Sequence, residues 1–242
     1  MGRSSSFVLV AVIAITACTG RSAPLERLEV GAGDGPVLVL LHGYGSRPEH
    51  LASFGERTDL PRGTRVVLPY APERTRPTDA ADGFVWWRFP GDLAALPRAS
   101  IPEMAGARER VRGLLDDVVA RLGVPSDRIV LAGFSQGAML ALDVALHDPR
   151  PLAGIALMSG TLVDEREWGP RFASRRGLAA YVSHGRADPV LPYANAERLV
   201  ERMRQGGLGV RFTTFDGAHV VTPEVSTELA EFVREVAGHG DP

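Results

Sequence analysis

The sequence predicts an α/β fold built on a doubly wound, mostly parallel sheet flanked by helices. Short apolar runs typical of buried strands alternate with longer stretches of helical periodicity, and this order favours a parallel sheet. The 242 residues, 45% of them apolar, suffice for one sizeable core and are short for two domains. We therefore expect a single domain over residues 25–240, without a large cap domain.

The expected strands cover residues 25–30, 36–41, 65–68, 129–132, 152–157, 178–182 and 210–215, and the expected helices cover 48–59, 102–122, 138–142, 194–205 and 223–236. The continuous apolar run 37–41 is typical of a strand buried on both faces. Residues 70–98 are irregular and too long for a plain connection, so they are expected to carry function. Residues 160–177 are predicted to be a polar loop whose acidic side chains form a solvated face: Asp164, Glu165 and Glu167.

Residues 1–17 have the features of a lipoprotein signal peptide. Arg3 precedes the apolar run 7–17, which is too short to span a bilayer comfortably. The following residue, Cys18, is the only cysteine, and the segment resembles a bacterial lipobox, in which cleavage precedes an acylated cysteine. The alternative is a plain secretory signal followed by an incidental cysteine. On the lipobox interpretation, residues 18–24 tether an exported lipoprotein to the cell envelope membrane, and one cysteine allows no intrachain disulfide.

A Gly-Phe-Ser-Gln-Gly segment at residues 133–137 lies between an expected strand and an expected helix. This order is typical of the nucleophile elbow of α/β hydrolases, in which a tight turn exposes the hydroxyl of a serine, here Ser135. The flanking glycines, Gly133 and Gly137, are needed because side chains at these positions would clash in so tight a turn. An ordinary glycine-rich turn is the alternative, so the assignment depends on an acid and a histidine further along the chain.

Both partners follow Ser135 in the required order. Asp188 follows the expected strand 178–182, and His219 follows the strand 210–215. The carboxyl ends of parallel strands share one edge of the sheet, where the sites of such folds lie. His42 precedes Ser135 and His184 shares the loop of Asp188, so we interpret both as structural.

These residues predict serine hydrolase chemistry without a metal or a cofactor. Ser135 attacks a carbonyl carbon, His219 moves the proton, and Asp188 orients the imidazole. The backbone N–H groups of Tyr44, in the loop His-Gly-Tyr-Gly, and of Gln136 are expected to form an oxyanion hole.

Two tryptophans in the irregular segment allow two interpretations. Trp86 and Trp87 line a substrate pocket, or they close over the edge of the sheet. The net charge of −2 and the lack of a basic stripe give no indication of nucleic-acid binding.

The elbow block of residues 123–138 resembles the phospholipase/carboxylesterase family, which includes the acyl-protein thioesterases. The segments 41–45, 184–192 and 217–219 resemble further blocks of that family. The resemblance extends over residues 36–236 and implies an α/β hydrolase acting on carboxylic esters or thioesters, with Trp86 and Trp87 in the position of an aromatic loop beside the acyl pocket. Tyr44 stands where acyl-protein thioesterases usually have leucine, and Ser46 stands where they have an acidic residue.

The sequence thus predicts a serine carboxylesterase that acts on small or medium acyl esters through an acyl-enzyme intermediate. Acyl thioesterase or lysophospholipase activity is an alternative, as is a peptidase on the same fold. A surface lipoprotein that only binds its ligand is an alternative of another class. The expected partners are an ester substrate and, through the lipid anchor, a membrane; the oligomeric state is left open.

Overall fold

The computed structural model describes residues 11–12, 24–56, 59–76, 79, 82–89 and 91–238. Cys18, nearly all of the predicted signal peptide and the tether up to residue 23 lie outside these residues. Among the described residues, no helix combines the length and apolarity needed to cross a membrane.

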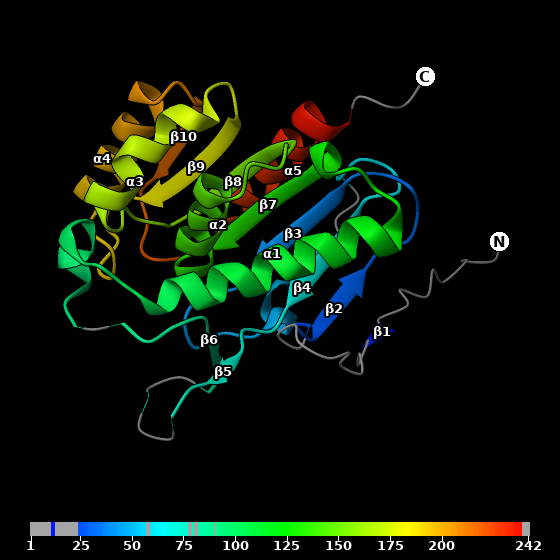
Figure 1. The fold of residues 1–242 in the computed structure, drawn as a ribbon, viewed down its shortest axis with the longest axis horizontal. Coiled ribbons are helices and arrows are strands. Elements are labelled where there is room, and N and C mark those ends of the chain that lie inside the picture. The colour runs from blue at the N-terminus through cyan, green and yellow to red at the C-terminus, as the bar shows by residue number, and fades with distance from the viewer. Residues whose placement is uncertain are drawn as a thin grey trace.

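One sheet organises the molecule (Figure 1). Its strands are β1 (Ala11–Val12), β2 (Arg27–Val30), β3 (Val37–Leu41), β4 (Arg65–Pro69), β7 (Ile129–Phe134), β8 (Gly154–Met158), β9 (Ala179–Gly185) and β10 (Gly209–Phe215). The spatial order is β1-β2-β4-β3-β7-β8-β9-β10. The strands from β4 to β10 are parallel, whereas β2 is antiparallel to β4 and β1 is antiparallel to β2. The mostly parallel sheet predicted from the sequence is confirmed.

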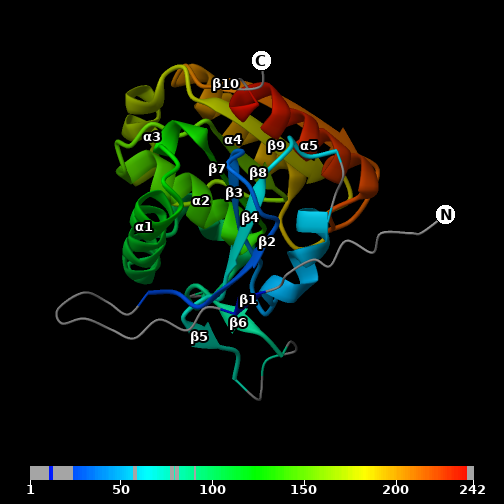
Figure 2. The same cartoon turned by 90° about the vertical axis from the view of Figure 1, so that its right-hand side faces the viewer.

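Helices cover both faces of this sheet, as the view along it shows (Figure 2). The α-helices are α1 (Glu103–Leu122), α2 (Gln136–His147), α3 (Glu165–Arg171), α4 (Tyr193–Gln205) and α5 (Pro223–Ala237). The 3₁₀ helices are η1 (Pro48–Glu56), η2 (Leu93–Arg98), η3 (Ser126–Arg128) and η4 (Phe172–Arg175). Helices α1 to α4 pack on one face, and η1 and α5 pack on the other. The fold is therefore doubly wound.

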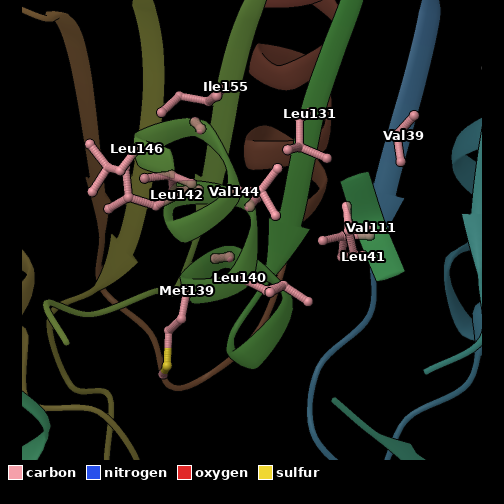
Figure 3. Close-up of a cluster of buried hydrophobic side chains, with 14 of the residues drawn as sticks. Val39, Leu41, Val111, Leu131, Met139, Leu140, Leu142, Val144, Leu146 and Ile155 are labelled. Carbon is pink, nitrogen blue, oxygen red and sulfur yellow. The ribbon is translucent and has the colours of Figure 1, made fainter. Parts of the chain in front are cut away.

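The alternation of side chains along each strand divides the core into two layers. In β3, Val39 and Leu41 belong to the layer beneath α1 and α2, whereas Leu38 and Leu40 belong to the layer beneath η1 and α5. Figure 3 shows the first layer, where side chains from β3, β7, β8, α1 and α2 gather. All five residues of β3 are buried, so the prediction of a strand covered on both faces is confirmed.

The structure confirms one prediction of local structure and corrects another. The sequence predicted a helix over residues 48–59, and residues 48–56 form the 3₁₀ helix η1. The prediction of a polar loop over residues 160–177 is wrong, because α3 and η4 lie there and bury Trp168 and Phe172. These two aromatic residues, four positions apart, anchor an otherwise polar helix to the core.

The three acids of this segment do more than face solvent. Asp164 caps α3 by accepting a hydrogen bond from the N–H of Glu167. The Glu167 carboxylate contacts His147 Nε2 at 2.9 Å, and Glu165 forms an ion pair with Arg202 at 3.1 Å. In place of the predicted solvated acidic face, the segment therefore has a helix cap and glutamates that are paired with arginines and with His147.

The long connection between β4 and α1 is largely irregular, as predicted. Its regular elements in the described residues are the hairpin of β5 (Glu73–Arg74) and β6 (Phe84–Val85) and the short helix η2. No large cap domain is built from the described residues of this segment.

The direction of winding reverses at β3. From this strand the chain passes to β4 on one side, and later returns to β7 on the other side. At such a switch point the loops that follow the two neighbouring strands diverge and leave a crevice at their carboxyl ends. The loop 42–45 and Ser135 follow these two strands directly, so the topology places both at the crevice.

Candidate active site

Ser135 occupies a tight turn between β7 and α2. Its backbone has φ 54° and ψ −117°, a strained conformation for a residue with a side chain. A Cβ atom on Gly133 would overlap the backbone of Gly137, and one on Gly137 would overlap the carbonyl of Leu41. Glycine at 133 is therefore required for the reason that the sequence suggested, whereas glycine at 137 is required by the close approach of β3. The turn has the geometry of a nucleophile elbow.

Three predicted residues lie in one hydrogen-bonded chain. The distance from His219 Nε2 to Ser135 Oγ is 2.8 Å, and that from His219 Nδ1 to Asp188 Oδ2 is 2.6 Å. The Asp188 side chain is fully buried, whereas 15% of the His219 side chain is exposed. The structure thus brings together residues that are 84 and 31 positions apart in the sequence, with the imidazole open to a substrate.

The Asp188 carboxylate is held firmly by its own loop. Its Oδ1 accepts hydrogen bonds from the backbone N–H groups of Val190 at 2.8 Å and Leu191 at 2.9 Å. These bonds direct Oδ2 toward His219. Hydrogen bonds of an ionised acceptor are the stronger kind, so the acid is well oriented.

The loops that carry the acid and the histidine are tied together by backbone contacts. Ala187 N–H donates to the carbonyl of Gly217 at 3.1 Å, and Arg186 N–H donates to the carbonyl of Phe215 at 2.9 Å. Gly185 lies so close to this second loop that a Cβ atom would overlap the Gly217 carbonyl. The separation of Asp188 and His219 is therefore fixed by the backbone, a link that the sequence analysis missed.

The loop 42–45 lies against the elbow. A Cβ atom on Gly43 would be 3.3 Å from Ser135 Cβ, so glycine allows the two backbones to approach closely. Within the described residues, the N–H of Tyr44 has no backbone acceptor. Gln136 is the first residue of α2, where N–H groups lack acceptors within the helix. Two donors thus adjoin Ser135.

His42 holds this loop, as expected from the sequence. Its Nε2 accepts a hydrogen bond from the N–H of Ala71 at 3.1 Å, and its Nδ1 donates to the carbonyl of Gly43 at 2.8 Å. Burial lowers the pKa of His42 to about 4, so its ring is neutral at neutral pH. This histidine therefore serves the loop and has no contact with Ser135 Oγ among the hydrogen bonds of the described chain.

The side chain of Gln136 has a structural role that sequence reasoning missed. It is fully buried, accepts a hydrogen bond from Trp86 N–H at 3.0 Å and donates to the Trp87 carbonyl at 2.8 Å. The available signal was a lone polar residue between the nucleophile and an apolar helix. Gln136 thereby fastens the irregular segment to the elbow.

Trp86 and Trp87 belong to the core, so the prediction that they line a substrate pocket is wrong. Their side chains are only 2% and 1% exposed, and Trp86 Nε1 donates to the His42 carbonyl at 2.9 Å. The alternative interpretation, closure over the sheet, describes them. Three other aromatic residues near the site are half-buried: Phe134, whose ring centroid is 5.0 Å from that of His219, and Tyr44 and Phe89, whose ring centroids are 5.6 Å apart.

Comparisons with known proteins agree with this geometry. Residues 31–237 match the model of the phospholipase/carboxylesterase family. The chain is 28% identical over 217 residues to acyl-protein thioesterase 1 of Neurospora crassa, covering 82% of this chain and 86% of the relative. It is 26% identical over 229 residues to acyl-protein thioesterase 1 of Gibberella zeae, covering 90% and 97%.

A solved structure extends the similarity to three dimensions. The crystal structure of esterase PE8 superimposes with a TM-score of 0.77 at 26% sequence identity, covering 88% of this chain and all of that one. The order of the strands, the elbow at the switch point and the family match over most of the chain point the same way. This chain therefore belongs to the phospholipase/carboxylesterase family and has the α/β-hydrolase fold.

Proposed function

We propose that this protein is a serine carboxylesterase that acts through Ser135, His219 and Asp188. The observation that carries the proposal is the continuous hydrogen-bonded chain from Ser135 Oγ through His219 to the buried Asp188 carboxylate. Its position at the switch point of the sheet, beside two backbone donors, supports the same role.

On this proposal, each group has a distinct part. Ser135 Oγ attacks the ester carbonyl carbon while His219 Nε2 takes the hydroxyl proton, and Asp188 stabilises the imidazolium. The N–H groups of Tyr44 and Gln136 donate to the oxyanion of the tetrahedral intermediate. His219 then returns the proton to the leaving alcohol as the C–O bond breaks. A water molecule, activated by the same imidazole, hydrolyses the acyl-Ser135 ester.

We further propose that the substrates carry small or medium acyl groups. Tyr44, in the loop that lies against the elbow, packs its half-buried ring on that of Phe89, and the pair offers an apolar contact of limited extent. Two large apolar side chains near the acid and the histidine are exposed: Val190, two residues after Asp188, is 41% exposed, and Val220, directly after His219, is 46% exposed. Apolar surface at these positions suits a short hydrocarbon chain.

Thioester hydrolysis is a second candidate, because both relatives described above are acyl-protein thioesterases. The same serine, histidine and oxyanion donors serve either bond, since attack at the carbonyl carbon is common to both. Lysophospholipase activity is consistent with the family description in the same way.

A substrate panel tests this function. We expect the purified protein to hydrolyse p-nitrophenyl acetate, butyrate and octanoate faster than the palmitate, and to be labelled covalently at Ser135 by a fluorophosphonate. Acyl thioesters of the same chain lengths, assayed in parallel, decide between the two candidates. Folded protein that neither turns over any member of the panel nor takes the label would contradict a hydrolase role.

The N-terminal segment supports a separate proposal, that the protein is exported and anchored by lipid on Cys18. It rests on the apolar run 7–17 directly before the only cysteine. Mass spectrometry of protein from a bacterial membrane fraction should show a mature N-terminus at Cys18 that carries acyl chains. A mature chain that retains an unmodified Cys18, or that begins after it, would overturn the proposal.

A further inference from the structure

His184 is a fully buried histidine that the proposed reaction does not use directly. It lies near the end of β9, four residues before Asp188. Its ring is 6.2 Å from that of Tyr193, at the start of α4. The sequence suggested a structural histidine, and its contacts show a more specific arrangement.

The Nε2 atom of His184 faces two oxygen atoms. It lies 3.0 Å from the carbonyl oxygen of Leu191 and 3.3 Å from Asp188 Oδ2. Because both neighbours are acceptors, this nitrogen carries the hydrogen atom, and the other ring nitrogen is the bare one. The ring therefore donates into the acid loop.

The same Asp188 oxygen serves two histidines. Oδ2 accepts from His219 Nδ1 at 2.6 Å and faces His184 Nε2 at 3.3 Å, while Oδ1 is occupied by the two backbone N–H groups. The carboxylate thus accepts three hydrogen bonds, and the His184 N–H, which donates to the Leu191 carbonyl, lies in contact with Oδ2 as well.

Burial favours the neutral form of His184. It lowers the pKa of this ring, and the effect outweighs the contacts with the Leu191 carbonyl and with Asp188 that favour the charged form. The backbone of Gly160 is a further, minor contact of the ring that favours the charged form, and Nδ1 makes no hydrogen bond of good geometry among the described residues. A neutral donor can hold the acid without adding a positive charge beside His219.

We propose that His184 is a positioning residue that acts through Asp188. It bridges the Asp188 carboxylate and the Leu191 carbonyl, fixes Oδ2 for His219, and withdraws negative charge from that oxygen. The inference rests on the proposed function, because it assigns His184 a part in the work of the same three residues.

The proposal predicts the direction in which the pH dependence of kcat/KM changes when the His184 donor is removed. Removing the donor leaves more negative charge on Asp188 Oδ2, which stabilises the imidazolium form of His219. General-base catalysis needs the neutral imidazole, so the acid limb of kcat/KM moves to higher pH. The titratable groups that face His184 are Asp188 in its own loop, His219 after β10, and Tyr193 on α4.

The test compares His184→Leu with His184→Gln. Leucine removes the donor and keeps apolar volume, whereas the glutamine amide can reach as far as Nε2 and donate. We expect His184→Leu to lower kcat by about 10- to 100-fold, as for outer partners of other sites. KM should stay within about twofold, and the acid limb should move upward by about half a pH unit or more. His184→Gln should recover most of kcat.

His147→Leu is the matched control. His147 is also partly buried, and its ring contacts the carboxylates of Asp143 and Glu167. It is the last residue of α2 and lies away from the loop of Asp188. The activity of the His147→Leu variant should match that of the native protein. Thermal unfolding should show that all variants are folded.

A readout independent of turnover is the NMR titration of the His219 ring in the native protein and in His184→Leu. We expect the midpoint to move upward in the variant. An unchanged midpoint, or an equal loss of kcat in the leucine and glutamine variants, would overturn the proposal. Failure of the proposed function would give a different result from failure of the His184 proposal. The native protein would then turn over no ester, whereas the NMR comparison would still report on the effect of His184 on His219.

Discussion

Replacing Ser135 with alanine is expected to lower kcat/KM for p-nitrophenyl butyrate by roughly 10⁴- to 10⁶-fold. The substitution removes the oxygen atom that lies 2.8 Å from His219 Nε2 and that would form the acyl-enzyme. The fold should persist, because alanine occupies less space in the same turn and the flanking glycines remain. Steady-state kinetics and the loss of fluorophosphonate labelling measure the effect.

A serine remote from the site provides the control. Ser174 is exposed in η4, where its hydroxyl donates to the Arg171 carbonyl at 2.7 Å. The Ser174→Ala variant loses the same atom and should retain full activity and labelling. If Ser135→Ala kept kcat within tenfold of the native value while folded, Ser135 would not be the nucleophile.

Asparagine at position 188 is expected to reduce kcat by about 10⁴-fold, as it does in other serine hydrolases. The structure gives a specific reason. The N–H groups of Val190 and Leu191 require an acceptor at the Oδ1 position, so the asparagine oxygen must lie there. The new amide NH₂ then faces His219 Nδ1 and donates to it.

The consequence is a histidine in the wrong tautomer. With Nδ1 acting as an acceptor, Nε2 carries the hydrogen atom and cannot take the proton of Ser135. The overall geometry should barely change, so the loss should fall on kcat, with little effect on thermal unfolding. Stopped-flow measurement of acylation isolates the affected step.

Asp216→Asn is the matched control for the loss of the carboxylate charge in Asp188→Asn. Asp216 is close to His219 in the sequence, but its side chain is 97% exposed and its ion pair with Arg186 is long, at 3.8 Å. Loss of an exposed carboxylate should leave kcat within about twofold, because solvent screens it. Equal losses in the two asparagine variants would show that Asp188 contributes only general charge.

The elements that the sequence predicted well share one physical property: their local pattern matches their final surroundings. The run 37–41 is apolar at every position, and β3 is buried on both faces. The glycine at 133 has a steric requirement that is confined to five residues, because a Cβ atom there would overlap the backbone of Gly137. Such features need no knowledge of distant contacts.

The elements that were missed depend on distant partners. Helix α3 has mainly polar residues, and it forms because Trp168 and Phe172 reach a core assembled from other parts of the chain. The two tryptophans of the irregular segment are buried because the Gln136 side chain fastens their backbone to the elbow. Both features depend on contacts with residues that are far away in the sequence.

The sequence by itself determined the fold class, the family resemblance and the three candidate residues, because chain order and motif spacing carry that information. Only the tertiary structure decided how they are held: the backbone bonds between the loops of Asp188 and His219, the donors around the carboxylate, and the place of His184 among them. These features arise where the ends of β9 and β10 meet. Hydrogen bonds act over about 3 Å and depend on direction, so residues far apart in the chain acquire them only when the sheet is assembled.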